Sequence, residues 1–247
     1  MPKIFEKSLR EVAEEIEKIT LSRENGIHVA KSLRMRRGDS LIVSDGEGRD
    51  FCCEIEQTSP EVVLKVLFVA PTDTEPEVYI TLYQGVPKGD KFAQVVKQCT
   101  EIGVSEFVPV IMARSISRPD EKTAAKKVER WRKIAHEAAG QSRRGIIPKV
   151  ADMMSLEDSV KKLSGDRAIV FYESGGEGLK DILNDFKREN VHSADIFIGP
   201  EGGFEPSEVE ALKNAGARVA TLGRRILRTQ TAPLAASANI IYELSSP

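Results

Sequence analysis

Two glycine-containing segments hold the residues most suited to chemistry. The first, at 199–203, is Gly-Pro-Glu-Gly-Gly and follows the apolar run 196–198, and the second, at 222–232, follows a similar run. A short apolar run that ends in glycine or proline is typical of a buried parallel strand, and open α/β sheets bind ligands where such strands end. Gly202 and Gly203 allow a close approach of the backbone to a ligand. The two segments therefore predict a clamp for a small polar molecule with a flat part.

Other catalytic and metal-binding motifs are missing from the sequence. The segment 140–145, Gly-Gln-Ser-Arg-Arg-Gly, departs from the Gly-x-Ser-x-Gly nucleophile elbow and follows a predicted helix, not a strand. No Gly-x4-Gly-Lys-Ser/Thr phosphate loop occurs, so nucleoside triphosphate hydrolysis has no support. The three histidines and three cysteines lack metal-ligand spacing. We expect no metal, and we interpret the cysteines as reduced packing residues.

Composition predicts a globular, cytoplasmic protein. The 247 residues suffice for one large or two ordinary domains, and the 40% that are hydrophobic allow a substantial core. No apolar run approaches the roughly 20 residues of a membrane span, and the first residues lack the apolar core of a signal peptide. We therefore expect no membrane partner and no secretion.

Basic residues gather in two regions although the net charge is only −2. The stretch 114–149 contains eleven Lys or Arg and four Asp or Glu. A second cluster consists of Lys31, Arg34, Arg36 and Arg37. Such patches suit the phosphate backbone of a nucleic acid. The alternative interpretation is a solvated helix face.

The first 70 residues are rich in short strand signals. Ser22 is the predicted cap of a helix that runs to about Leu33, and the turn Asp-Gly-Glu-Gly at 45–48 predicts a β-hairpin. The segment 9–19 has helical spacing, yet its end could begin a strand. Short, closely spaced strands predict a small barrel. The expected strands are 41–43, 51–55 and 62–69.

The polar segment 71–76 resembles a linker, and we place a domain boundary after residue 72. From Val78 onward the pattern alternates between strands and helices, which predicts an α/β domain with a parallel sheet. The expected strands are 78–83, 106–111, 167–172, 195–199 and 218–222. The expected helices are 92–102 with Asp90 as N-cap, 121–139, 179–186, one that begins at Pro206 and one that begins near Pro233. Unaided, this pattern predicts an ordinary doubly wound sheet, because true knots are essentially absent from proteins.

Four motifs together resemble one known family. They are Lys-Gln-Cys-Thr-Glu-Ile-Gly-Val at 97–104, Glu-Ala-Ala-Gly-Gln-Ser-Arg-Arg at 137–144, Gly-Pro-Glu-Gly-Gly-Phe at 199–204 and Leu-Gly-x-Arg-Ile-Leu-Arg-Thr-x-Thr-Ala at 222–232. Their order and sequence are similar to the 16S ribosomal RNA (uracil-N3)-methyltransferase family of the SPOUT class. The resemblance implies a PUA-like β-barrel at 1–72 that docks RNA, and a SPOUT methyltransferase domain with a trefoil knot at 73–247. It also implies a homodimer that modifies ribosomal RNA of the small subunit.

The resemblance implies S-adenosylmethionine as the cofactor, held by backbone groups of both loops and by apolar contacts. Because this cofactor brings an activated methyl group, the protein mainly binds it, orients it and excludes water. The residues expected to bind it are Gly199, Pro200, Glu201, Gly202, Gly203, Leu222, Gly223, Ile226, Leu227, Arg228, Thr229, Thr231 and Ala232.

The acceptor in this family is uracil N3, a weakly acidic imide nitrogen on the base-pairing edge. The resemblance therefore implies an unpaired or extruded base, and a group that takes the proton or stabilises the anion. Arg228 is the first candidate for steadying the anion or a target phosphate. Arg143 and Arg144 follow, acting across a dimer interface, with ordinary surface ion pairs as the alternative interpretation.

Two further positions concern the removal of the N3 proton. Glu201 could contact the cofactor or act as the base, and its alternative role is to cap the following helix. Gln230 occupies a position where the family usually has Glu, and an amide cannot accept a proton as a carboxylate does. We predict a structural or cofactor-contacting role for Gln230.

Two alternatives remain open at this point. One is a SPOUT methyltransferase with another RNA acceptor, such as a ribose 2′-hydroxyl. The other is a non-catalytic RNA-binding or ribosome-assembly factor that kept the fold. The presence of both glycine-containing segments favours an enzyme.

Overall fold

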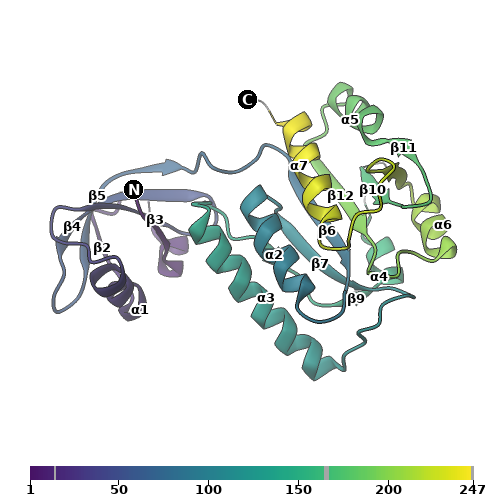
Figure 1. The fold of residues 1–247 in the computed structure, drawn as a ribbon. Helices are drawn as coiled ribbons and strands as arrows, with labels where there is room; N and C mark the ends of the chain where they lie inside the picture. The colour runs from purple at the N-terminus through teal and green to yellow at the C-terminus, as the bar shows by residue number, and fades with distance from the viewer. Residues whose placement is uncertain (14, 164–166, 246–247) are drawn as a thin grey trace. The chain divides into compact units, whose positions relative to one another are not determined.

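The computed structural model describes residues 1–13, 15–163 and 167–245 (Figure 1). Within it the chain forms two compact units. The first consists of Met1–Glu75 and Ala139–Ile147, and the second of Pro76–Ala138 and Pro148–Pro247. The boundary expected after residue 72 lies three residues before the end of the first stretch. The sequence pattern did not predict that 139–147 belong to the first unit.

The first unit is built on a five-stranded sheet with the order β1-β3-β4-β5-β2. Only β1 and β3 pair in parallel, and the other pairs are antiparallel. All three predicted strands occur in it. The strands are β1 (Lys3–Phe5), β2 (Lys18–Thr20), β3 (Ser40–Ser44), β4 (Arg49–Gln57) and β5 (Val63–Pro71).

Local signals account for much of this unit. Ser22 caps α1 (Arg23–Ile27) by accepting a hydrogen bond from the amide of Asn25, and a π-helical turn, His28–Ser32, continues the helix. In the hairpin turn before β4, the carboxylate of Asp45 accepts from the amide of Glu47 at 2.8 Å. The ambiguous segment 9–19 contains both alternatives in part. It begins within the 3-10 helix Lys7–Glu11 and ends within β2.

The second unit is built on a parallel sheet with the order β11-β13-β10-β12-β6-β7-β8, and β9 also pairs with β7. The five predicted strands are present, and their ends differ from the prediction by at most two residues. The strands are β6 (Tyr79–Gly85), β7 (Glu106–Ile111), β8 (Lys149–Val150), β9 (Met154–Ser155), β10 (Ala168–Phe171), β11 (Glu177–Gly178), β12 (Ser193–Ile198) and β13 (Arg218–Thr221).

Helices cover both faces of this sheet. Neighbouring strand residues point to opposite faces, and buried apolar side chains on each face pack against helices. Ile80 and Leu82 pack on the face covered by α2, α5 and α7, whereas Tyr83 and Phe197 stack on the face covered by α4 and α6. Figure 1 shows α7 beside α2, and their residues are in contact. The helices are α2 (Lys91–Ile102), α3 (Glu121–Gln141), α4 (Leu156–Val160), α5 (Leu179–Arg188), α6 (Pro206–Asn214) and α7 (Ala232–Leu244).

One helix start differs in detail from the prediction. Asp90 occupies the N-cap position of α2, but its side chain makes no capping hydrogen bond. Its carboxylate instead accepts two hydrogen bonds from the guanidinium of Arg130, at 2.7 and 3.1 Å. The ion pair therefore replaces the expected cap.

The trefoil knot implied by the resemblance stays a prediction. Among the described residues, no helix has both the length and the apolar character to cross a membrane.

Candidate functional site

The carboxyl ends of three neighbouring strands, β10, β12 and β13, border one cavity of about 870 Å³. This edge of a parallel sheet is where open α/β folds bind ligands. The cavity belongs wholly to the second unit. Its lining consists of Lys91, Phe171, Tyr172, Glu173, Ser174, Gly175, Ile198, Gly199, Pro200, Glu201, Gly202, Gly203, Thr221, Leu222, Gly223, Arg224, Arg225, Ile226, Leu227, Arg228, Thr229, Gln230 and Ala232.

The loop 199–203 turns sharply after β12. The amide of Gly203 donates to the carbonyl of Pro200 at 3.0 Å, and Gly203 has φ +68°, in the left-handed region. A Cβ on Gly203 would collide with the carboxylate of Glu173. A Cβ on Gly199 would lie 3.1 Å from the backbone of Gly203. The left-handed φ therefore favours glycine at 203, and the close approach of the two backbones leaves little room for a Cβ at 199.

Arg114, in the segment after β7, holds the outer side of this loop. Its guanidinium donates to the carbonyl of Gly202 at 2.9 Å and to the carboxylate of Glu205 at 2.8 Å. Glu205 and Glu208 form a capping box at the start of α6. The loop is thus fixed between a strand, a helix start and an arginine.

Glu201 ties the same loop to the start of α2. Its carboxylate accepts from Lys91 Nζ at 2.6 Å and from the amide of Lys88 at 3.1 Å. Partial burial alone would raise the pKa of Glu201, but the hydrogen bonds from Lys91 and from backbone amides outweigh this effect and lower the pKa. The capping box of α6 uses Glu205 and Glu208. The alternative that Glu201 caps this helix is therefore wrong.

A buried hydroxyl joins the second segment to the first. Thr229 is 7% exposed, and its Oγ1 donates to the carbonyl of Gly199 at 2.8 Å. The carbonyl of Arg228 accepts from the amides of Thr231 at 2.7 Å and Ala232 at 2.9 Å, which turns the chain into α7. These bonds fix the backbone of Arg228 at the cavity.

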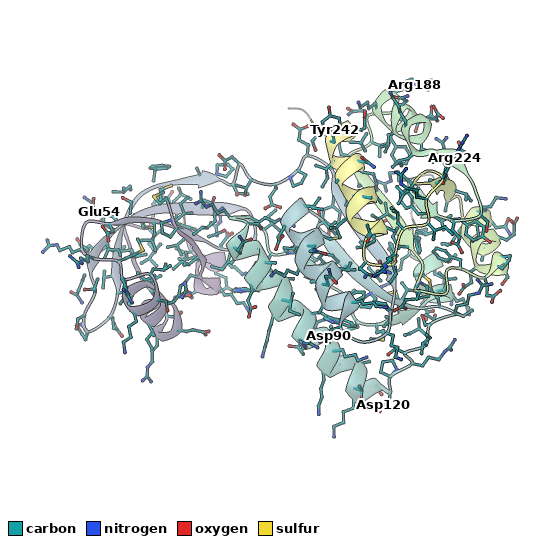
Figure 2. The ribbon with its side chains drawn as sticks, viewed as in Figure 1. Glu54, Asp90, Asp120, Arg188, Arg224 and Tyr242 are labelled. Atoms are coloured by element: carbon teal, nitrogen blue, oxygen red, sulfur yellow. The ribbon has the colours of Figure 1, made fainter. Side chains whose placement is uncertain are left out.

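Three arginines give the cavity a positive rim. Arg224, Arg225 and Arg228 line it and are exposed, and Figure 2 shows Arg224 on the loop after β13. Within the described part of the chain, none of their guanidinium groups has an ion pair or a side-chain hydrogen bond. Ile226, between them, is 84% exposed. Uncompensated guanidinium groups attract phosphate and other anions.

The structure brings the predicted cofactor-binding residues together, with one exception. Both segments line the one cavity, including Leu222, Leu227 and Gly223, whose φ is +97°. Thr231 is not part of the lining. It is exposed and occupies the N-cap position of α7. Gln230 does line the cavity and is half-buried.

Arg143 and Arg144 belong to the first unit and do not line this cavity. Arg144 is 3% exposed, and its guanidinium lies 2.6 Å from the carboxylate of Glu75. The amide of Gly145 also donates to Glu75, at 3.0 Å. Arg144 thus has the surroundings of a structural ion pair, whereas Arg143 is exposed and has φ +61°.

Sequence reasoning missed the third side of the cavity. The segment 171–175, Phe-Tyr-Glu-Ser-Gly, begins with the last residue of β10 and contributes to the lining. The signal was available, since an apolar run is followed there by Gly175 and Gly176. Lys91 was missed for a different reason, because only the tertiary contact with Glu201 brings the start of α2 to the site.

Family comparisons agree with this architecture. Residues 74–241 match the RNA methyltransferase domain, and residues 21–67 match the RNA methyltransferase PUA domain. The chain belongs to the RNA methyltransferase family. The smaller match lies within the first unit, and the larger match contains the cavity.

Individual relatives cover most of the chain. The ribosomal RNA small subunit methyltransferase E of Bacillus subtilis is 34% identical over 98% of this chain and 97% of its own length. The protein of that name from Mycobacterium bovis is 33% identical, over 85% of this chain and 80% of its own.

Solved structures are similar over the same extent. The ribosomal RNA small subunit methyltransferase E of Neisseria gonorrhoeae, bound to S-adenosyl methionine, has a TM-score of 0.84 and 28% identity, covering 97% of this chain and 96% of its own. A putative methyltransferase from Legionella pneumophila, in complex with the cofactor SAM, has a TM-score of 0.82 and 26% identity, covering 96% of each chain.

Proposed function

We propose that this protein transfers a methyl group from S-adenosylmethionine to N3 of a uridine in 16S ribosomal RNA of the small subunit. The observation that carries the proposal is the single cavity formed by the two glycine-containing segments at the ends of adjacent parallel strands. The names of the relatives, and the cofactor bound in two similar structures, support it.

The cavity fits such a cofactor in size and in chemistry. Its volume of about 870 Å³ lies within the usual range for small-molecule sites. Gly199, Gly203 and Gly223 line the cavity and have no side chain that could occupy it. Leu222 and Leu227 supply apolar contacts for a flat ring, and backbone groups of both loops supply hydrogen bonds.

Arg228 is the proposed catalytic residue. When bound, S-adenosylmethionine supplies a methyl group on a sulfonium sulfur and leaves as a neutral thioether once that methyl is joined to N3. The N3 proton passes to solvent, and the electron pair that remains on the negatively charged uracil imide forms the new bond to the methyl carbon. The guanidinium of Arg228 lines the cavity, has no ion-pair or side-chain hydrogen-bond partner among the described residues, and can stabilise that charge.

For Glu201 we propose the role of an anchor in the cofactor loop. Its carboxylate already accepts hydrogen bonds from Lys88 and Lys91. Because its pKa is lowered by these bonds, it binds a proton less readily than an ordinary glutamate does. An ionised, bonded carboxylate suits loop positioning better than proton abstraction.

On the RNA side we propose that Arg224 and Arg225 bind phosphate groups near the target, since both are exposed and lack carboxylate partners among the described residues. Arg143 is a further candidate, being exposed on the unit that carries the PUA match. Arg144 would reach RNA only if its ion pair with Glu75 broke, so we assign it a structural role.

By resemblance to the SPOUT class, we also propose that the protein is a cytoplasmic homodimer and that its methyltransferase domain contains a trefoil knot.

The test is methylation of unmodified small-subunit ribosomal RNA, free and in assembled subunits, followed by nucleoside mass spectrometry. The proposal expects 3-methyluridine from at least one of the two substrates. A 2′-O-methylated nucleoside would support another acceptor. No methylated product from either substrate would favour an RNA-binding or assembly factor without catalytic activity.

A further inference from the structure

A buried glutamine lies where the two loops of the cavity meet. Gln84, near the end of β6, is 0% exposed. Its Nε2 lies 3.0 Å from Thr229 Oγ1, 3.2 Å from the carbonyl oxygen of Gly199 and 3.0 Å from that of Gly85. Thr229 in turn donates to the same carbonyl of Gly199. One side-chain amide thus contacts β6 and both loops.

The surroundings fix the orientation of this amide. Its neighbours present oxygen atoms that accept hydrogen bonds, so Nε2 must face them. Among the described residues, no donor reaches Oε1 of Gln84. A buried acceptor without a donor lowers stability, and an apolar side chain of similar size would avoid that loss. A glutamine is therefore poorly suited to packing alone at this position.

The end of β6 also lies directly against the first loop. A Cβ on Gly85 would come within 2.5 Å of Pro200 Cδ, so the two backbones meet with no side chain between them. Gln84 is in register with Ile198, the last residue of β12. Movement of either loop would therefore disturb the hydrogen bonds of Gln84.

We propose that Gln84 is a positioning residue that couples the 199–203 loop to the 222–232 segment. It does not line the cavity. Through Gly199 it fixes the cofactor loop, and through Thr229 it fixes the residue next to Arg228. The inference rests on the proposed function, because it assigns the two loops to cofactor binding and catalysis.

Hydrogen exchange tests the coupling without any ligand. Gln84→Met keeps the length of the side chain and removes the donor. Peptides covering 199–203 and 222–232 should both exchange faster in this variant, by about tenfold or more. The control is Ile80→Val, a core change in the same strand whose residue is 0% exposed and does not line the cavity. Loop exchange equal to that of the control would overturn the proposal.

Ligand binding gives the second readout. The Kd for S-adenosylhomocysteine should rise about tenfold in Gln84→Met, whereas Ile80→Val should lower the Tm and leave the Kd unchanged. A Gln84→Met protein that loses Tm but keeps the wild-type Kd would show a purely structural role and contradict the coupling. If the wild type itself failed to bind, the proposed function would fail, and hydrogen exchange would still decide the coupling.

Thr229 supplies an independent pair of variants should Gln84→Met fail to fold. Thr229→Val keeps the shape and removes the hydroxyl, while Thr229→Ser keeps the hydroxyl. We expect loop exchange to rise in Thr229→Val and to be largely restored in Thr229→Ser. If Gln84→Met folds, the double variant Thr229→Val, Gln84→Met should raise loop exchange by less than the product of the two single effects, because both changes remove hydrogen bonds of the same network. Equal exchange in the Val and Ser variants would overturn the proposal.

Discussion

The 199–203 loop and the 222–228 segment line the same cavity but are held in different ways. Arg114, Lys88 and Lys91 all bind the first loop, and an internal hydrogen bond closes it. The second segment instead presents Arg224 and Arg225 to solvent without partners among the described residues. A loop fixed in advance suits a small cofactor, since little order must be gained on binding. Unpaired guanidinium groups suit a large anionic substrate.

The strongest test of this contrast is removal of Arg228, the arginine that we assign to the uracil. Arg228→Ala should lower the rate of methyl transfer by roughly 10²- to 10³-fold, because a preorganised positive group beside the developing anion is lost. The rate of Arg228→Lys should lie between those of wild type and Arg228→Ala, since lysine keeps the charge without the planar guanidinium. Single-turnover rates at saturating cofactor give the measurement. A rate within about threefold of wild type would remove Arg228 from the chemistry.

The fixed loop should tolerate no side chain at Gly203. Gly203→Ala introduces a Cβ at φ +68° and against the carboxylate of Glu173, so the Kd for S-adenosylhomocysteine should rise about tenfold or more. Gly38→Ala is the matched control. Its φ is +89°, but a Cβ there meets nothing within 4 Å, and it lies in the first unit. Equal cofactor affinity in both variants would mean that the loop does not form the binding site.

The unpaired arginines should act on RNA and not on the cofactor. Each of Arg224→Ala and Arg225→Ala should weaken RNA binding several-fold and reduce the salt dependence of log K by about one unit. Arg188→Ala, on α5, is the control, because Arg188 already pairs with Asp185 at 2.6 Å. Binding to small-subunit RNA is measured over a series of salt concentrations. An unchanged slope in both rim variants would place the phosphate contacts elsewhere.

The Glu201 anchor should give a small pH-dependent stability. Because the folded pKa of Glu201 lies below its ordinary value of 4.5, its contribution is present above pH 4.5 and is lost as the pH falls through the lowered value. Lys91 is partly exposed, so the contribution should be only about 0.5 kcal/mol. Urea unfolding of wild type and Glu201→Gln should differ at neutral pH and converge in acid. A constant difference at every pH would contradict the anchor.

The smallest effect is expected at Gln230. Gln230→Glu should change turnover by less than about twofold, because we assign stabilisation of the uracil anion to Arg228 and not to a base at this position. Initial rates and cofactor affinity are measured together. A many-fold rise in turnover at unchanged cofactor affinity would show that a carboxylate at 230 acts as the base.

Local sequence signals were sufficient for the longer elements and for two sides of the site. Apolar runs marked five strands of the parallel sheet to within two residues, and glycines marked the loops that follow β12 and β13. The two-residue strands β8, β9 and β11 and the short helix α4 were not predicted. Both signals depend on neighbours in the chain, which is why one sequence reveals them. The contribution of 171–175 could have been found in the same way, since it repeats the pattern of strand and glycine.

Tertiary partners could not be predicted in the same way. The sequence pattern could not show which ion pairs form: Arg144 with Glu75, Arg130 with Asp90, and Lys91 with Glu201. Each pair joins residues far apart in the chain, and its energy depends on geometry and on exclusion of water. The Gln84 network is missed for the same reason, because a lone glutamine in a strand carries no local signal.

We assign the two loops to cofactor binding and Arg228 to the uracil. Calorimetric titration with S-adenosylhomocysteine, of the wild type beside Arg228→Ala, tests this assignment most directly. We expect saturable binding by both proteins, with Kd values that differ by less than about threefold. Absence of binding by the wild type would contradict the methyltransferase proposal. Loss of binding in Arg228→Ala alone would place this arginine on the cofactor.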